Sequence, residues 1–160
     1  MATSEAKERN ALDKFLSTED QGTVVAAIRE AETTTSGEIK VHIEPRCPVP
    51  DSYARAIDLF GRLGLEKTRE RNAVLIYIAS DDKRFAMVGD TGIHAEVGAP
   101  FWSEATATLS QHFKSAKVKD GLVEAIAAIG RRLAAKFPHT DADTNELSDE
   151  ISTQEPPPKS

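Results

Sequence analysis

The 160-residue sequence has a single cysteine, Cys47, and a single tryptophan. One cysteine can form neither an internal disulfide nor a multi-cysteine zinc site, which favours a reducing compartment or indifference to redox state. Long hydrophobic runs are also missing: the longest, residues 73–79, is far shorter than the roughly 20 residues that a membrane helix needs. No apolar stretch follows the first basic residues, so no secretory signal is visible. We therefore predict a soluble, cytoplasmic protein without an integral membrane segment.

Positive charge is scarce as well. The chain carries 26 acidic and 20 basic residues, a formal net charge of −6. Six of the acids and only one lysine lie in the last 23 residues, which leaves the rest of the chain nearly neutral. Nucleic-acid binding needs a dense positive surface that displaces counterions. The composition therefore excludes nucleic acid as a partner and leaves a protein partner open.

What the sequence does contain is the pattern of one α/β domain over residues 17–138. Residues 1–16 have few apolar anchors and predict a weak helix. Residues 139–160 form an acidic tail that ends in prolines, and its part up to about residue 152 is a candidate to dock on the domain. We therefore expect three parts, of which only the middle one builds a large core.

Three segments have the character of strands. Residues 38–44 alternate strictly between apolar and polar, residues 73–79 are apolar throughout, and residues 84–89 follow a short turn-forming link. A helix between the first two segments makes a right-handed crossover, so these strands should be parallel, whereas the second and third should form an antiparallel hairpin. The prediction is a mixed sheet with helices packed on it.

This topology divides the candidate site residues between two ends of the sheet. Asp81 and Asp82 follow the second strand, and Glu44 ends the first. Carboxylates are ligands for hard cations such as Ca²⁺ or Mg²⁺, and ligands of α/β sheets usually bind beyond the carboxyl ends of parallel strands. The alternative is that both aspartates are ordinary, solvated turn residues.

The opposite end collects a second group. It contains Glu38 at the start of the first strand and Asp90 after the third, both candidate metal ligands. Arg69 and Arg71 lie nearby in the sequence and could hold a phosphate. A surface network of ion pairs is the alternative interpretation. Asp82 and Asp90 stand about 20 Å apart along a strand of this length, so they cannot share one ion.

Several segments resemble the small soluble branch of the TPM domain family, in order and spacing, over about residues 17–152. They are SGEIKVHIEP (36–45), AIDLFGRLGL (56–65), KTRERNAVLIYIAS (67–80), RFAMVGDTGIHAEVGAPFW (84–102), GLVEAIAAIGRRLAAKFP (121–138) and NELSDEIS (145–152). The resemblance implies a three-layer α/β/α sandwich with a mixed, about four-stranded sheet. Since the pattern above supplies three strands, the missing one is expected within residues 93–99 or in the loops.

The family resemblance also implies functions. Members are linked to acid-phosphatase activity, divalent-metal binding, photosystem II repair and accessory roles for membrane proteins. Glu38, Asp82 and Asp90 stand where relatives carry acidic or polar residues. The chain departs from the family pattern at two places. Asn72 is followed by alanine where relatives have glycine, which indicates a less unusual backbone there. Pro100 is not followed by the aspartate of membrane-anchored relatives, and the missing carboxylate counts against phosphatase chemistry.

Two functions therefore stay open. The first is a module that binds Ca²⁺ or Mg²⁺ and acts as an accessory or interaction domain without turnover, because no complete nucleophile–base set is visible. The alternative is a metal-dependent acid phosphatase acting on phosphomonoesters, with the aspartates as ligands and an arginine on the phosphate. The sequence assigns no catalytic residue.

Overall fold

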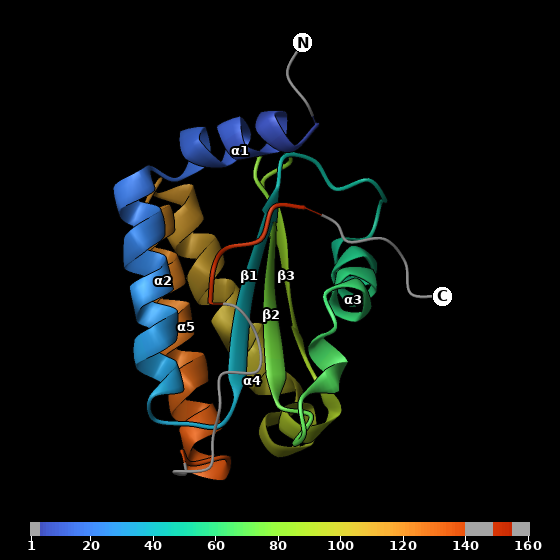
Figure 1. Cartoon of the computed structure of the whole chain (residues 1–160), viewed down its shortest axis with the longest axis vertical. Coiled ribbons are helices and arrows are strands. Elements are labelled where there is room, and N and C mark those ends of the chain that lie inside the picture. Colours follow the sequence, from blue (N-terminus) through green and yellow to red (C-terminus); the bar gives the residue numbers. More distant parts are fainter. Residues whose placement is uncertain (1–3, 140–148, 155–160) are drawn as a thin grey trace.

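A mixed three-stranded sheet in the order β1-β2-β3 lies at the centre of the computed structural model, which describes residues 4–139 and 149–154 (Figure 1). β1 pairs with β2 in parallel, and β2 pairs with β3 antiparallel, as predicted from the crossover and the hairpin. The elements are α1 (Ser4–Phe15), α2 (Thr18–Glu32), β1 (Glu38–Glu44), α3 (Ser52–Arg62), the 3-10 turn η1 (Leu65–Lys67), β2 (Ala73–Ala79), β3 (Arg84–Gly89), α4 (Thr91–Lys114) and α5 (Val118–Lys136).

β2 is buried on both faces because helices cover each side of the sheet. Its residues Val74, Ile76 and Ile78 join a core with α2, α4 and α5, which contains Ile28, Leu109 and Leu133 among others. The alternate β2 residues face a second core formed with α3 and η1, which includes Leu59 and Leu65. The period-2 alternation of a strand thus divides one apolar segment between two cores.

Local sequence signals set the starts of two helices. Ser17 caps α2 by accepting a hydrogen bond from the Asp20 N–H at 3.1 Å, and Asp51 caps α3 by accepting from the Tyr53 N–H at 2.9 Å. Helical spacing predicts that α3 buries Tyr53, Ile57, Phe60 and either Leu63 or Gly64. Phe60 is buried, but Tyr53 and Ile57 are half exposed. The other buried residues of α3 are Arg55, Ala56 and Leu59.

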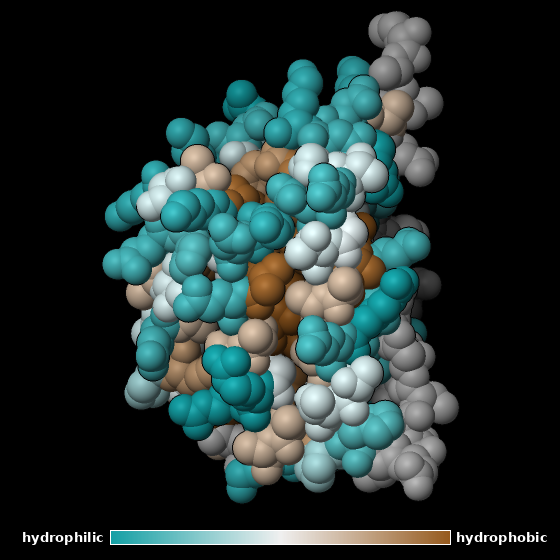
Figure 2. Space-filling view, turned by 90° about the vertical axis from the view of Figure 1, so that its left-hand side faces the viewer, coloured by the Kyte–Doolittle hydropathy of each residue, from teal (hydrophilic) through white to brown (hydrophobic). Residues whose placement is uncertain are grey.

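The expected fourth strand is not found among the described residues. Residues 93–99, where it was sought, belong to α4, which contains a non-helical residue at Gly98 (φ 73°) followed by Pro100. The fold is therefore an α/β arrangement of helices against both faces of a three-stranded mixed sheet. Figure 2 shows the side on which α2 and α5 lie, where hydrophilic residues surround a band of hydrophobic ones.

A short C-terminal segment, residues 149–154, lies along the outer edge of β1 and is called the strap below. Its Ser152 forms an isolated parallel bridge with His42 (Figure 1). Residues 140–148 and 155–160 of the predicted tail lie outside the described residues. Among the helices of the described part, none is long and apolar enough to cross a membrane.

Candidate functional site

Three carboxylates from separate parts of the chain converge beside the start of β1. Glu32 ends α2, Glu38 begins β1, and Asp149 begins the strap. One carboxylate oxygen from each lies within 4.8 Å of the others. Glu38 is 3% exposed, and the Asp149 side chain is 11% exposed. We call this group the acidic cluster, and its existence depends on the docked strap.

The surroundings make full ionisation of the cluster unfavourable. Burial, the hydrogen bond to Asp149 and the charges of Glu38 and Asp149 together raise the pKa of Glu32 to about 10. The Ile39 N–H, which donates to Glu32 Oε2 at 2.9 Å, acts in the opposite direction. Since like charges in a low dielectric repel strongly, a proton or a cation must balance this site.

Two basic residues lie beside the acidic cluster. Arg29 Nε is 3.6 Å from Asp149 Oδ2, and the Arg29 side chain is largely exposed. Lys40 Nζ donates to the Glu150 carbonyl at 2.8 Å. Burial lowers the pKa of Lys40, whereas the charges of Glu150, Asp149 and Glu32 oppose that shift. The basic residues therefore offset part of the negative charge and hold the strap at the same time.

The donor set suits a hard cation. Carboxylate oxygens are preferred ligands of Ca²⁺ and Mg²⁺, and two ligands on opposite sides of an ion at about 2.4 Å each are separated by about 4.8 Å. The oxygens of the cluster meet that spacing. Nearby in the fold, the buried Asn72 donates through Nδ2 to Ser36 Oγ at 3.2 Å, while its Oδ1 has no hydrogen-bond partner among the described residues.

Glu38 shares its end of the sheet with Asp90, as the topology predicted, but Asp90 has other contacts. Its carboxylate accepts from Arg71 Nε at 2.8 Å and Nη2 at 3.0 Å, and it caps α4 by accepting from the Thr91 N–H at 2.7 Å. The hydrogen bond and charge of Asp90 raise the pKa of Arg71. Arg69 is exposed. Asp90 and Arg71 thus form the ion pair that the alternative interpretation described.

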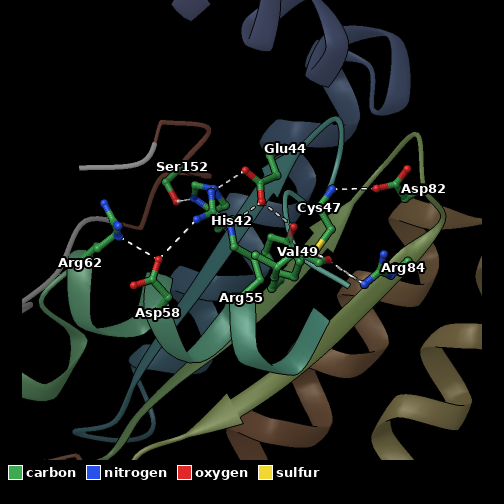
Figure 3. Close-up of polar contacts among 11 residues, drawn as sticks. His42, Glu44, Cys47, Val49, Arg55, Asp58, Arg62, Asp82, Arg84 and Ser152 are labelled. Atoms are coloured by element: carbon green, nitrogen blue, oxygen red, sulfur yellow. Dashed lines mark hydrogen bonds and ion pairs between the residues drawn. The ribbon is translucent and has the colours of Figure 1, made fainter. Parts of the chain in front are cut away.

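Asp81 and Asp82 lie at the other end of the sheet, beyond β2. Asp81 is exposed, and Asp82 Oδ2 accepts from the Cys47 N–H at 2.7 Å (Figure 3). The hydrogen bond shows that Asp82 holds the loop after β1 against the β2–β3 hairpin. The structure therefore separates the four predicted ligands into two groups, with Glu38 and Asp90 at one end and the two turn aspartates at the other.

Glu44 at that second end belongs to a buried polar network. Arg55 of α3 donates to both its carboxylate oxygens, from Nη2 at 2.8 Å and from Nε at 2.9 Å (Figure 3). The Tyr77 hydroxyl also donates to Glu44 Oε2. Burial, reinforced by these contacts, raises the pKa of Tyr77. With its oxygens bound in this way, Glu44 joins α3 to the sheet.

Sequence reasoning missed Glu32, Asp149, Arg55 and Tyr77. Glu32 is the last residue of a helix and belongs to no motif. Two signals pointed to Asp149: its place within the NELSDEIS segment of the family resemblance, and a partial match of residues 141–149 to a calcium-binding loop that lacks the turn glycine and the final glutamate. Arg55 and Tyr77 lay on positions that a helix and a buried strand would give to apolar residues.

Comparisons with known proteins agree on the fold. The BA42 protein of the psychrophilic bacterium Bizionia argentinensis, solved by NMR, is 40% identical to this chain; the match covers 88% of this chain and 96% of BA42, with a TM-score of 0.80. The N-terminal domain of a protein from P. gingivalis, at 19% identity, covers 79% of this chain and 82% of its own with a TM-score of 0.59, which shows a shared fold. No curated protein matches the chain. Residues 10–132 match the TPM domain, and the chain therefore belongs to the TPM domain family.

Proposed function

We propose that this chain is a divalent-cation-binding accessory module, which holds Ca²⁺ or Mg²⁺ at Glu32, Glu38 and Asp149. The observation that carries the proposal is the convergence of three carboxylates from α2, β1 and the strap within 4.8 Å. Such an arrangement repels itself unless positive charge enters it, and hard cations take oxygen ligands of this kind. The protein partner and the cytoplasmic location predicted from the sequence belong to the same proposal.

This proposal moves the site relative to the sequence analysis. Glu38 stays a ligand, and Glu32 and Asp149 replace Asp90, whose carboxylate is paired with Arg71. Asp81 and Asp82 form the competing location at the other end of the sheet. A metal-dependent phosphatase needs an arginine for the phosphate, and Arg71 is already engaged by Asp90. The accessory role without turnover is therefore the function that we favour.

Thermal unfolding in millimolar Ca²⁺ or Mg²⁺ tests the site. A ligand that binds only the folded chain must stabilise it, by about 2.7 kcal/mol at a hundredfold excess over Kd. We expect the cation to raise the melting temperature of the wild type and of an Asp81→Asn/Asp82→Asn double variant, but not of Glu38→Gln. A cation effect that survives in Glu38→Gln and disappears in the double variant would place the site at the other end. No effect in the wild type would reject cation binding.

Hydrolysis of an aryl phosphate separates the two functions. The accessory module should show no turnover above background, with or without added cation. Turnover that a chelator removes and that Glu38→Gln abolishes would instead support the phosphatase. Glu30→Gln serves as the matched control, because Glu30 is an exposed residue on the same helix as Glu32.

A further inference from the structure

The outer edge of β1 is an acceptor for an extended chain segment. In this strand, the backbone groups of Ile39, Val41 and Ile43 point away from β2. The Ile39 N–H donates to Glu32 Oε2, whereas Val41 and Ile43 bind the strap: Ser152 N–H donates to the Val41 carbonyl, and Ile43 N–H donates to the Ser152 carbonyl, both at 3.0 Å. This is the hydrogen-bond pattern by which a sheet takes up a parallel strand.

The side chains of the strap alternate as they do in a strand. Ile151 and Thr153 are buried, with Ile151 in the core shared by α2, α4 and α5. Ser152 points the other way, with its Oγ 2.8 Å from His42 Nδ1. His42 is fully buried and stacks on Tyr77, which fixes the ring. The edge thus accepts an apolar residue followed by a hydroxyl residue.

The strap is a short segment, and its contacts must outweigh the order that it adopts on docking. Its sheet pairing is one bridge with two backbone hydrogen bonds. These bonds and the burial of Ile151 must offset the entropy of ordering the segment. Lys40, which donates to the Glu150 carbonyl, and Arg29, which pairs with Asp149, add to these contacts. Short segments of this kind open at a lower free energy than the whole domain.

We propose that the outer edge of β1 is a binding site for an extended segment of a partner protein, and that the strap is its built-in occupant. The partner segment runs parallel to β1 and carries an apolar residue followed by serine or threonine, which take the places of Ile151 and Ser152. This inference does not rest on the proposed cation.

A fluorescent peptide with the sequence of residues 145–154 tests the site. Its anisotropy is measured as the wild type or Ile151→Asp is added; the substitution removes the apolar anchor of the strap and leaves Glu32 and Glu38 unchanged. We expect the peptide to bind Ile151→Asp at least tenfold more tightly than the wild type. The conservative variant Ile151→Val keeps the strap docked and should behave as the wild type does.

A second variant guards against a folding defect. Ser152→Pro removes the N–H that donates to the Val41 carbonyl and leaves the core side chains in place. Circular dichroism must show both variants folded, and Ser152→Pro should also gain peptide affinity. Equal peptide affinity for the wild type and both folded variants would overturn the proposal, as would a peptide that binds none of them.

Light scattering and chelation complete the experiment. If the strap of a second copy were the occupant, the wild type would form dimers that Ile151→Asp abolishes, and this result would also overturn the proposal.

All titrations are run in chelator and in millimolar Ca²⁺. A wild type that gains no thermal stability from Ca²⁺ while Ile151→Asp binds the peptide would reject the cation site alone and leave the peptide site standing.

Discussion

At the scale of single residues, the acidic cluster shows how tertiary structure changes ordinary carboxylates. Glu32, Glu38 and Asp149 are separated in sequence and carry no motif, but the fold brings their oxygens within 4.8 Å. Burial and the neighbouring carboxylates then raise the pKa of Glu32 from 4.5 to about 10. Because the folded state binds this proton more tightly than the unfolded state, folding and protonation of Glu32 are linked.

The pH dependence of stability follows from that linkage. A group whose pKa is raised on folding contributes its full stability below the unfolded pKa and loses it as the pH rises through the folded pKa. In chelator, the wild type should therefore lose free energy of unfolding from about pH 5 to about pH 10, measured by urea denaturation. Glu32→Gln should flatten this slope and Glu30→Gln should not. A slope unchanged in Glu32→Gln would contradict the assignment.

At the scale of elements, α3 is fixed to the sheet by a charge pair as well as by packing. Arg55 is 6% exposed and binds Glu44 through two hydrogen bonds, whereas Arg62 on the same helix pairs with the half-exposed Asp58 at 2.8 Å. Removing one partner of a buried pair leaves an uncompensated charge, and an exposed pair contributes little. The two arginines of α3 therefore differ in energetic role.

This difference predicts that replacing the two arginines by alanine lowers the free energy of unfolding by unequal amounts. Arg55→Ala should destabilise the protein by about 3–5 kcal/mol, because Glu44 then stays buried without its partner. Arg62→Ala should cost about 1 kcal/mol or less. Urea unfolding followed by circular dichroism measures both. Similar costs for the two variants would show that Glu44 is less dependent on Arg55 than the geometry indicates.

At the scale of the whole molecule, β2 connects two cores that share no helix. Leu75 belongs to the core under α3, whereas Trp102 of α4 packs against the opposite core. Because both cores are built on the same strand, loss of one removes the support of the other. The described residues should therefore unfold as one cooperative unit.

Leu75→Ala tests this cooperativity. Truncating a fully buried leucine typically costs about 2–5 kcal/mol. The fluorescence of Trp102, the one tryptophan of the chain, should report the same lowered midpoint as far-ultraviolet circular dichroism, although Trp102 packs against the other core. Two separate midpoints would mean that the cores unfold independently.

The sequence by itself determined the strands, their pairing and most of the helices. Alternation marked β1 and a continuous apolar run marked β2, because these signals are local and repeat with the period of the element. It also divided the candidate ligands correctly between two ends of the sheet, since parallel pairing follows from the crossover. For α3 the spacing predicted the burial of Phe60 correctly and that of Tyr53 and Ile57 wrongly, because the helix turns the buried Arg55 toward Glu44, and hydrophobic spacing does not register an ion pair.

Only the tertiary structure decided what occupies the outer edge of β1. Six residues near the end of the chain return to that strand, bury Ile151 and place Asp149 beside Glu32 and Glu38. The docking depends on backbone groups left open by an edge strand and on carboxylates more than a hundred residues apart in sequence. Such long-range contacts leave no periodic signal, which is why the strap and the acidic cluster emerge only in the folded chain.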